Sequence, residues 1–220
     1  IYTLSLHDAL PILASINGQK VGTSEFAPTW SDYDKTVFFN VYDVTQHIRQ
    51  GDNELRVLLG NGFYNEQGGR YVKLKVSFGP PTLLYFLYIT YEDGLRERVY
   101  SDSKWQWTES PITFNSIYGG EDYDARLEPF PALGKKIWKP VVIQEGPKGK
   151  LTPQIAHSTK VMERYPVKQI LRKDSILVLD MGQNLAGYPE ITVQGESGMK
   201  IKLIPGETLD KDGLGNQRQT

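Results

Sequence analysis

Cysteine is absent from the 220 residues of this chain, and histidine occurs only three times. The lack of cysteine excludes a disulfide framework, a zinc–thiolate site and a cysteine nucleophile. Apolar runs of the roughly 18 residues that a membrane-spanning helix requires are also missing, so we expect no membrane partner. Neither sign of charge is in surplus, because 25 Lys and Arg stand against 26 Asp and Glu. This balance disfavours nucleic-acid binding, which requires a clustered basic excess.

The composition that remains is typical of a globular protein. Hydrophobic residues make up 39%, aromatic residues 11% and charged residues 23% of the chain, which leaves enough apolar side chains for a core. Intrinsic disorder is therefore not expected, and the length allows one or two domains. No feature of the sequence identifies the cellular compartment.

Both ends of the sequence are unusual. The segment Tyr2–Ile12 resembles the translation of a common short-read sequencing adapter, so we expect residues 1–12 to be a non-native scar and assign no chemistry to them. The alternative is a genuine amphipathic start that Pro11 ends. At the other end, the chain stops directly after a Gly-rich turn without a closing element. We therefore expect an internal fragment of a longer protein.

Residues 13–143 carry short β-type runs separated by turn residues. Asn17-Gly18 is the strongest hairpin-turn dipeptide, and β-branched or aromatic runs follow it at short intervals. The expected strands are residues 36–42, 54–59, 72–78, 83–91, 96–100 and 105–109. Only a short helical turn is expected, after Asp43. This pattern predicts an all-β domain, a jelly-roll β-sandwich.

Gly, Pro and Lys replace the apolar alternation at residues 144–150, and we place a linker there. Residues 151–220 then show β-type runs again, at 160–162, 165–171, 175–181, 190–194 and 199–204. They predict the start of a second β-sandwich domain that is truncated.

Several common catalytic patterns are missing. Gly60-Asn61-Gly62 has neither the third glycine nor the strand-to-helix context of a dinucleotide site. His47 and His157 lie far apart, without partners at metal-ligand spacing. No serine stands in the strand–turn–helix setting of an activated nucleophile. The sequence therefore does not support a nucleotide site, a histidine metal site or a catalytic triad.

Two loops suit a polar, ring-shaped ligand such as a sugar. Residues 61–71 combine amide side chains, aromatic rings and an arginine around several glycines, and sugar rings stack on aromatic faces while their hydroxyl groups pair with polar groups. The alternative is that Phe63 and Tyr71 fill the core. Residues 118–126 place three carboxylates beside two tyrosines, a set of oxygen ligands compatible with Ca²⁺ or sugar hydroxyls. Its alternative is a turn whose carboxylates pair with Arg126.

All four tryptophans are assigned to packing. Trp30 follows a proline turn, and we expect its ring in the core rather than on a ligand-facing surface. Trp105, Trp107 and Trp138 lie in or near expected strands and are also expected to pack.

An ordered set of motifs resembles bacterial α-L-rhamnosidases, glycoside hydrolase family 78. Those that are similar to the family's N-terminal accessory domain are Asn17-Gly18, residues 27–33, Tyr42-Asp43-Val44-Thr45, Gly51-Asp52-Asn53, residues 59–64, residues 118–126 and Trp138-Lys139-Pro140-Val141. Those that are similar to the concanavalin-like domain that follows are Asp180-Met181-Gly182-Gln183-Asn184 with Gly187, and Gly206-Glu207-Thr208-Leu209-Asp210 with Asp212-Gly213.

The resemblance implies that the parent protein hydrolyses terminal α-L-rhamnosides with inversion, using two carboxylic acids of an (α/α)₆ barrel that lies C-terminal to both domains. The fragment itself would then contain no catalytic residue and be inactive. Its partners would be a rhamnose-containing glycoside or polysaccharide and its own catalytic barrel. The alternatives are a stand-alone carbohydrate-binding module and the sugar-binding domain of a β-galactosidase-like glycosidase.

The resemblance also selects candidate carbohydrate-binding residues, since the accessory domain of some relatives binds rhamnose with calcium. They are Asn61, Tyr64, Asn65, Glu121 and Asp124. No cofactor is required by this interpretation, and calcium is an optional ligand with no assigned site. Phe63 stands where the family usually has Trp, and Asn61 where it usually has Asp, which weakens the case for metal-assisted binding at this loop.

Overall fold

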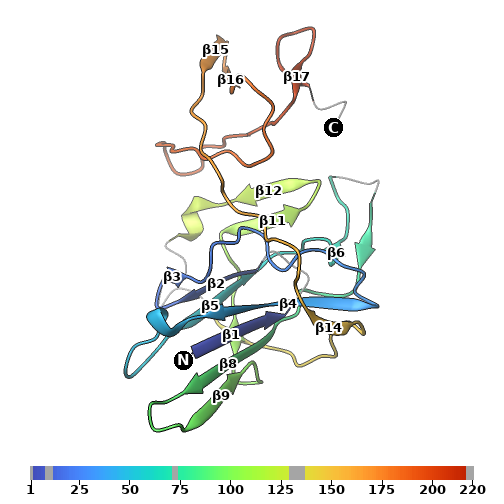
Figure 1. The fold of residues 1–220 in the computed structure, drawn as a ribbon. Coiled ribbons are helices and arrows are strands. Elements are labelled where there is room, and N and C mark those ends of the chain that lie inside the picture. Colours follow the sequence, from blue (N-terminus) through green and yellow to red (C-terminus); the bar gives the residue numbers. More distant parts are fainter. Residues whose placement is uncertain (1, 8–11, 71–73, 129–136, 217–220) are drawn as a thin grey trace. The chain divides into compact units, whose positions relative to one another are not determined.

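The computed structural model describes residues 2–7, 12–70, 74–128 and 137–216 (Figure 1). The chain divides into two compact units, residues 1–160 and residues 161–220, and each is described by itself. Within the described residues, the only helical elements are the short 3₁₀ turns η1 (Thr45–His47) and η2 (Ala125–Leu127). The all-β prediction is confirmed, as is the short helical turn after Asp43.

Unit 1 is built on a five-stranded sheet with the order β14-β4-β1-β8-β9. Its strands are β14 (Lys150–Pro153), β4 (Thr36–Asp43), β1 (Tyr2–His7), β8 (Leu84–Thr90) and β9 (Arg96–Tyr100). The pairs are antiparallel except β14 with β4, which is parallel. β8 and β9, which lie within or at two of the expected strands, form a hairpin around Gly94, which has a φ of +84°.

The segment that we expect to be non-native contributes the central strand of this sheet. Thr3 pairs with Asp43 on β4 and with Tyr88 on β8. Backbone ladder hydrogen bonds are available to any extended segment, whatever its side chains. The pairing is therefore compatible with a native or a foreign strand, and the non-native origin of residues 1–12 stays a prediction.

A three-stranded antiparallel sheet with the order β3-β2-β5 contains the first hairpin. Its strands are β2 (Ile12–Ile16), β3 (Gln19–Lys20) and β5 (Leu55–Leu59). At the turn, Asn17 has a φ of +52° and Gly18 a φ of +79°, as a two-residue hairpin of the Asn-Gly kind requires. The Asn17 amide also donates to the backbone oxygen of His47, which ties the hairpin to η1.

The core of unit 1 joins the two larger sheets. Ala14 and Ile16 on β2 belong to the same buried cluster as Tyr85 and Leu87 on β8, and residues from the connecting loops complete it: Val21, Tyr33, Val44 and Tyr64. Full burial of a Val, Leu or Ile side chain contributes about 1.5–3 kcal/mol to the free energy of folding. This apolar contact between two sheets makes unit 1 a β-sandwich.

Three small antiparallel pairs hold the loops at the margins of unit 1. They are β6 (Asn65–Glu66) with β7 (Val76–Ser77), β10 (Gln106–Trp107) with β13 (Lys139–Pro140), and β11 (Ile112–Ser116) with β12 (Gly120–Tyr123). Of the run expected at residues 72–78, only β7 is described as a strand. Residues 71–73, and with them Tyr71, lie outside the described residues.

The boundary of unit 1 lies later in the sequence than the linker expected at residues 144–150. Gly149 donates its backbone N–H to the Tyr33 oxygen at 2.9 Å, and Lys150 donates to the Lys35 oxygen at 2.9 Å. These bonds begin the parallel pairing of β14 with β4, so residues 150–153 belong to the first sheet. The difference arises because the local composition, rich in Gly, Pro and Lys, is typical of a linker, whereas the backbone of residues 150–153 pairs with β4.

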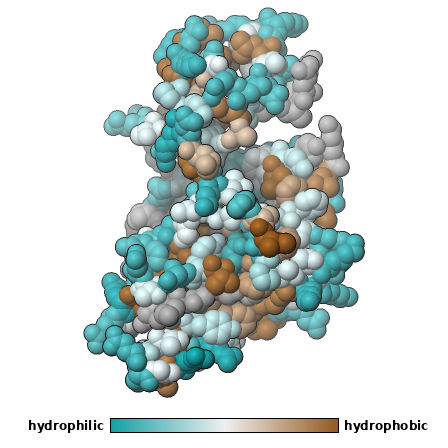
Figure 2. Space-filling model, in the orientation of Figure 1, coloured by the Kyte–Doolittle hydropathy of each residue, from teal (hydrophilic) through white to brown (hydrophobic). Residues whose placement is uncertain are grey.

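Unit 2 contains two hairpins among its described residues. β15 (Gln169–Lys173) pairs with β16 (Ile176–Asp180), and β17 (Thr208–Leu209) pairs with β18 (Gly215–Asn216). The strands expected at residues 160–162, 190–194 and 199–204 are not formed. Apolar side chains of this unit lie at its surface, where they are brown in Figure 2.

Candidate functional site

The amides of the first candidate loop bond to each other and to a neighbouring strand. Asn61 donates its backbone N–H to the side-chain oxygen of Asn115 on β11 at 2.8 Å, and its own amide donates to the Asn115 backbone oxygen at 3.1 Å. Asn65 then donates to the Asn61 side-chain oxygen at 2.9 Å. The structure thus brings Asn61 and Asn65 together and leaves Asn61 only partly accessible.

Tyr64 and Asn65 lie inside the unit. Tyr64 is 2% exposed, and its ring packs against Tyr33 and Phe78. Asn65 is 8% exposed and accepts hydrogen bonds from Gln67 and Ser77. Both residues therefore pack inside unit 1 and support the loop, and little of their surface is accessible to a ligand.

Glu66 is a site residue that the sequence analysis missed. It is 1% exposed and the only buried acidic residue of the described chain. Its carboxylate accepts from the Gly68 backbone N–H at 2.9 Å, the Ser116 hydroxyl at 2.9 Å and the Ile117 backbone N–H at 3.1 Å. Because hydrogen bonds to a buried charge are strong, Glu66 locks the first candidate loop onto the turn after β11.

The second candidate loop is the β11–β12 hairpin and the turn that follows it. Glu121 lies opposite Asn115 in the register and is exposed. Asp122 pairs with Arg70, and one of its oxygens lies 3.0 Å from the guanidinium. Arg70 also lies over the Phe114 ring, 4.4 Å from its centroid. Of the carboxylates in this loop, Glu121 is the best placed to meet a ligand.

Asp124 is engaged by its neighbour two residues on. Its carboxylate accepts from the Arg126 guanidinium at 2.8 and 2.7 Å and caps η2 through the Arg126 backbone N–H. The guanidinium hydrogen bond lowers the pKa of Asp124 to about 2, and the hydrogen bond from Arg70 likewise lowers the pKa of Asp122. Asp124 thus behaves as the turn alternative expected, whereas Asp122 pairs with Arg70 of the first loop and not with Arg126.

Three aromatic rings come together beside these loops. Trp30, from the turn after Pro28, lies 5.2 Å from Phe63 between ring centroids, with the planes inclined at 34°. Tyr118, from the β11–β12 turn, lies 6.1 Å from Phe63 with the planes at 79°. Trp30 is 65% exposed and Tyr118 48% exposed, while Phe63 is half-buried. We call these three residues the aromatic platform.

The exposure of Trp30 corrects the expectation that its ring lies in the core. The buried position in that turn is taken by Tyr33, which is 1% exposed, so Trp30 is left at the surface. Of the other tryptophans, Trp105 packs on Tyr85 as expected. Trp107 is 44% exposed and covered on one face by the Lys139 amine, and Trp138 is 39% exposed.

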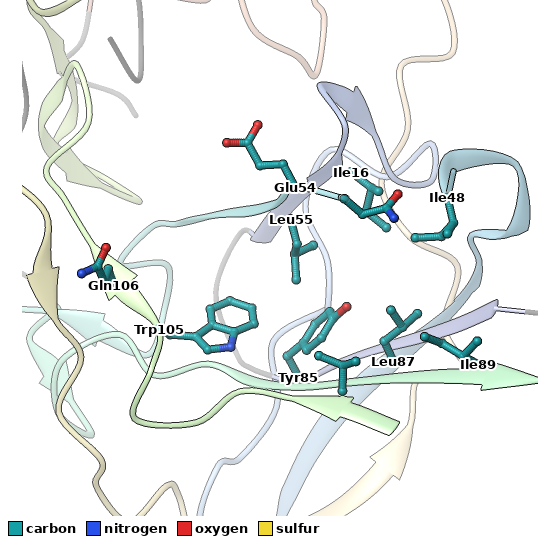
Figure 3. Close-up of a pocket in the computed structure, with 11 residues that line it drawn as sticks. Ile16, Ile48, Glu54, Leu55, Tyr85, Leu87, Ile89, Trp105 and Gln106 are labelled. Atoms are coloured by element: carbon teal, nitrogen blue, oxygen red, sulfur yellow. The ribbon is translucent and has the colours of Figure 1, made fainter. Parts of the chain in front are cut away.

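A cavity of about 460 Å³ opens between the two large sheets of unit 1. Figure 3 shows Trp105, Tyr85 and Leu55 pointing into it, whereas Glu54 and Gln106 point away at its margin. Desolvation in this setting raises the pKa of Tyr85. Most of its lining belongs to the core cluster or packs against it, so the cavity is part of the sandwich interior.

Neither a metal centre nor a membrane-spanning helix is found in the part of the chain that the structure describes. No three His, Asp or Glu side chains gather there as ligands for an ion. The 3₁₀ turns of the same residues are too short to cross a bilayer.

Two family models match the chain in succession. The model of the α-L-rhamnosidase N-terminal domain matches residues 9–163, and the model of the bacterial α-L-rhamnosidase concanavalin-like domain matches residues 170–220. Among curated proteins, the chain is 32% identical over 217 residues to an α-L-rhamnosidase of Formosa agariphila and 32% identical over 213 residues to one of Streptomyces avermitilis. These alignments cover 90% and 91% of the chain but only 22% and 20% of the relatives.

Solved structures show the same relationship. The Streptomyces avermitilis α-L-rhamnosidase complexed with L-rhamnose matches with a TM-score of 0.75 and 30% identity, over 83% of this chain and 18% of that one. The Aspergillus terreus α-L-rhamnosidase matches with a TM-score of 0.74 and 30% identity, over 84% and 22%. The chain thus spans about a fifth of the length of the relatives it matches.

Proposed function

This chain belongs to the α-L-rhamnosidase family, and from that premise we propose that it supplies the non-catalytic N-terminal β-domains of a glycoside hydrolase acting on terminal α-L-rhamnosides. The observation that carries the proposal is the succession of two accessory-domain models along the chain, which together reach from residue 9 to residue 220. The β-galactosidase-like alternative is not favoured, because the relatives that match are α-L-rhamnosidases.

The chemistry of the described side chains supports a non-catalytic role. An inverting glycosidase needs one carboxylic acid with a raised pKa and a carboxylate base about 6.5–9.5 Å away. In the described residues, every carboxyl group with a resolved shift has a lowered pKa: Asp32, Asp43, Asp122 and Asp124. The buried Glu66 has its oxygens occupied by protein donors.

Two activity measurements test this proposal. The 220-residue chain should release no p-nitrophenol from p-nitrophenyl α-L-rhamnoside. A chimera in which residues 13–220 replace the aligned portion of the Streptomyces avermitilis relative should retain hydrolysis, since the two folds match. Turnover by the chain alone, or a folded chimera without activity, would contradict the proposed role.

We further propose that unit 1 binds rhamnose-containing glycosides. Support comes from the exposed Glu121, the partly accessible Asn61 and the aromatic rings beside them, a combination typical of sugar-binding surfaces. Calorimetric titration of the whole chain with L-rhamnose tests the proposal. Heat of binding at millimolar sugar is expected, and its absence would leave unit 1 with a purely structural role.

A further inference from the structure

We infer that the aromatic platform of Trp30, Phe63 and Tyr118 is the part of unit 1 that binds sugar, by stacking against the apolar face of a 6-deoxyhexose without a bound metal ion. This inference rests on the proposed sugar binding and assigns it to different side chains from those that the sequence suggested.

Two rings of the platform are strongly exposed. Burial of aromatic rings is a main source of stability, so large rings left at the surface often mark a binding site. Trp30 is 65% exposed, although the neighbouring Tyr33 is buried. Tyr118 is 48% exposed at the tip of a hairpin. Both rings meet on Phe63, so three separate segments of the chain present aromatic surface at one place.

The chain segments that carry Phe63 and Tyr118 are held by buried contacts. The segment after Phe63 is fixed by the buried Tyr64 and by Glu66. Glu66 bonds to Ser116 and Ile117, which directly precede Tyr118. Because ligand affinity rises when the binding groups are already ordered, these contacts suit a preformed site. The same hydrogen bonds compensate the Glu66 carboxylate for its loss of contact with water.

The aromatic platform suits the shape and chemistry of a 6-deoxyhexose. The Trp30 plane is inclined by 34° and the Tyr118 plane by 79° to Phe63, so the rings present faces in different directions around one small area. A 6-deoxyhexose carries ring C–H groups and a methyl group that pack against such faces, and hydroxyl groups at its rim. Glu121, on the strand directly after the Tyr118 turn, is exposed and suited to accept from those hydroxyl groups.

Two of the three acidic side chains of residues 118–126 are paired with arginine. Asp122 is held by Arg70 and Asp124 by Arg126, and no three acidic or histidine side chains gather among the described residues. A Ca²⁺ ion takes six to eight oxygen ligands, several of them carboxylates. Such an ion would have to break both ion pairs to find its ligands here, whereas stacking requires neither change.

The test is a calorimetric titration of the full chain with L-rhamnose, in excess EDTA and in excess CaCl₂. Trp30→Ala and Tyr118→Ala should each raise the dissociation constant about tenfold or more, and Trp30→Phe should restore most of the affinity. Trp107→Ala is the matched control, because Trp107 is also exposed but lies on β10, and it should leave binding unchanged. Near-ultraviolet circular dichroism of each variant checks that unit 1 remains folded.

Three kinds of titration result would contradict the inference. Binding by the unmodified chain that Trp30→Ala leaves unaltered, or that Trp107→Ala weakens equally, would overturn the platform assignment. Binding lost in EDTA would overturn metal independence. Absence of binding by the unmodified chain would overturn this inference together with the proposed sugar binding, while the chimera measurement would still report on the accessory role in hydrolysis.

Discussion

Glu66 shows how a single side chain organises the candidate surface. Its carboxylate accepts hydrogen bonds from Gly68, Ser116 and Ile117 while almost fully buried. Glu66→Gln replaces one accepting oxygen with a donating amide, which leaves a protein N–H or hydroxyl facing another donor. We expect a loss of about 1–3 kcal/mol in the free energy of unfolding, measured by urea denaturation.

Glu54→Gln is the control for this prediction. Glu54 is also a glutamate in unit 1, but its exposed carboxylate pairs with Arg56 at the surface. An exposed ion pair of this kind contributes about 0–1 kcal/mol. Equal losses for the two variants would show that the buried hydrogen bonds of Glu66 do not stabilise the fold.

The ion pair of Asp124 with Arg126 makes a prediction about pH. The pKa of Asp124 is lowered from 3.8 to about 2 by the Arg126 hydrogen bonds, so its contribution to stability is fully present above the unfolded value and is lost as the pH falls through about 2. An NMR titration of the carboxyl carbon should give a midpoint near that lower value. Arg126→Ala should move the midpoint back towards 3.8, whereas Arg49→Ala should not. A midpoint near 3.8 in the unmodified chain would contradict the pairing.

Among the elements, β14 joins residues 150–153 to the sheet of unit 1. A Cβ atom on Gly149 would lie 2.6 Å from both the Thr36 nitrogen and the Tyr33 oxygen, backbone atoms that cannot turn aside. Gly149→Ala should therefore separate β14 from β4 and lower the stability of unit 1 by about 1–3 kcal/mol. Gly146→Ala, where the added atom has open space, should have little effect. Thermal unfolding compares the two variants. The same melting temperature for both would show that the pairing of β14 with β4 does not stabilise unit 1.

Elements governed by local chemistry were predictable from sequence, and elements that depend on distant partners were not. The first hairpin followed from Asn17-Gly18, because few residue pairs tolerate two positive φ angles. β14 was missed because its partner β4 lies far back along the chain. The candidate site behaved in the same way. The loops themselves were found, but Glu66 was not, since its partner Ser116 is 50 residues away.

The same limit explains the misplaced aromatic residues. Trp30, Tyr33 and Tyr64 are all large aromatic side chains in turns, and composition alone does not say which of them is buried. Packing places Tyr33 and Tyr64 in one ring cluster with Phe78 and leaves Trp30 outside. A residue predicted to be core therefore became the most exposed ring of the aromatic platform.

At the scale of the whole chain, the two units differ in how much they bury. Unit 1 contains every buried hydrophobic residue of the described chain, whereas the described residues 161–216 contain none. In the β15–β16 hairpin, adjacent apolar residues such as Ile170 and Leu171 are 61% and 42% exposed. Because neighbouring residues in a strand point to opposite faces, both faces of this hairpin are apolar and uncovered. Hydrophobic burial is the main favourable term in folding, so unit 2 has little to hold it together.

We therefore expect the units to differ sharply in backbone protection. In hydrogen exchange of the 220-residue chain, amides of β4 and β8 should be protected, and those of β15 and β16 should exchange almost as fast as in an unfolded peptide. Limited proteolysis should likewise remove unit 2 first and leave a product ending near residue 160. The control is the β8–β9 hairpin, which is similar in form but has β8 side chains in the core. Equal protection of the β8–β9 and β15–β16 hairpins would mean that the exposed apolar faces of unit 2 are covered in solution, for example by self-association, which sedimentation at several concentrations would reveal.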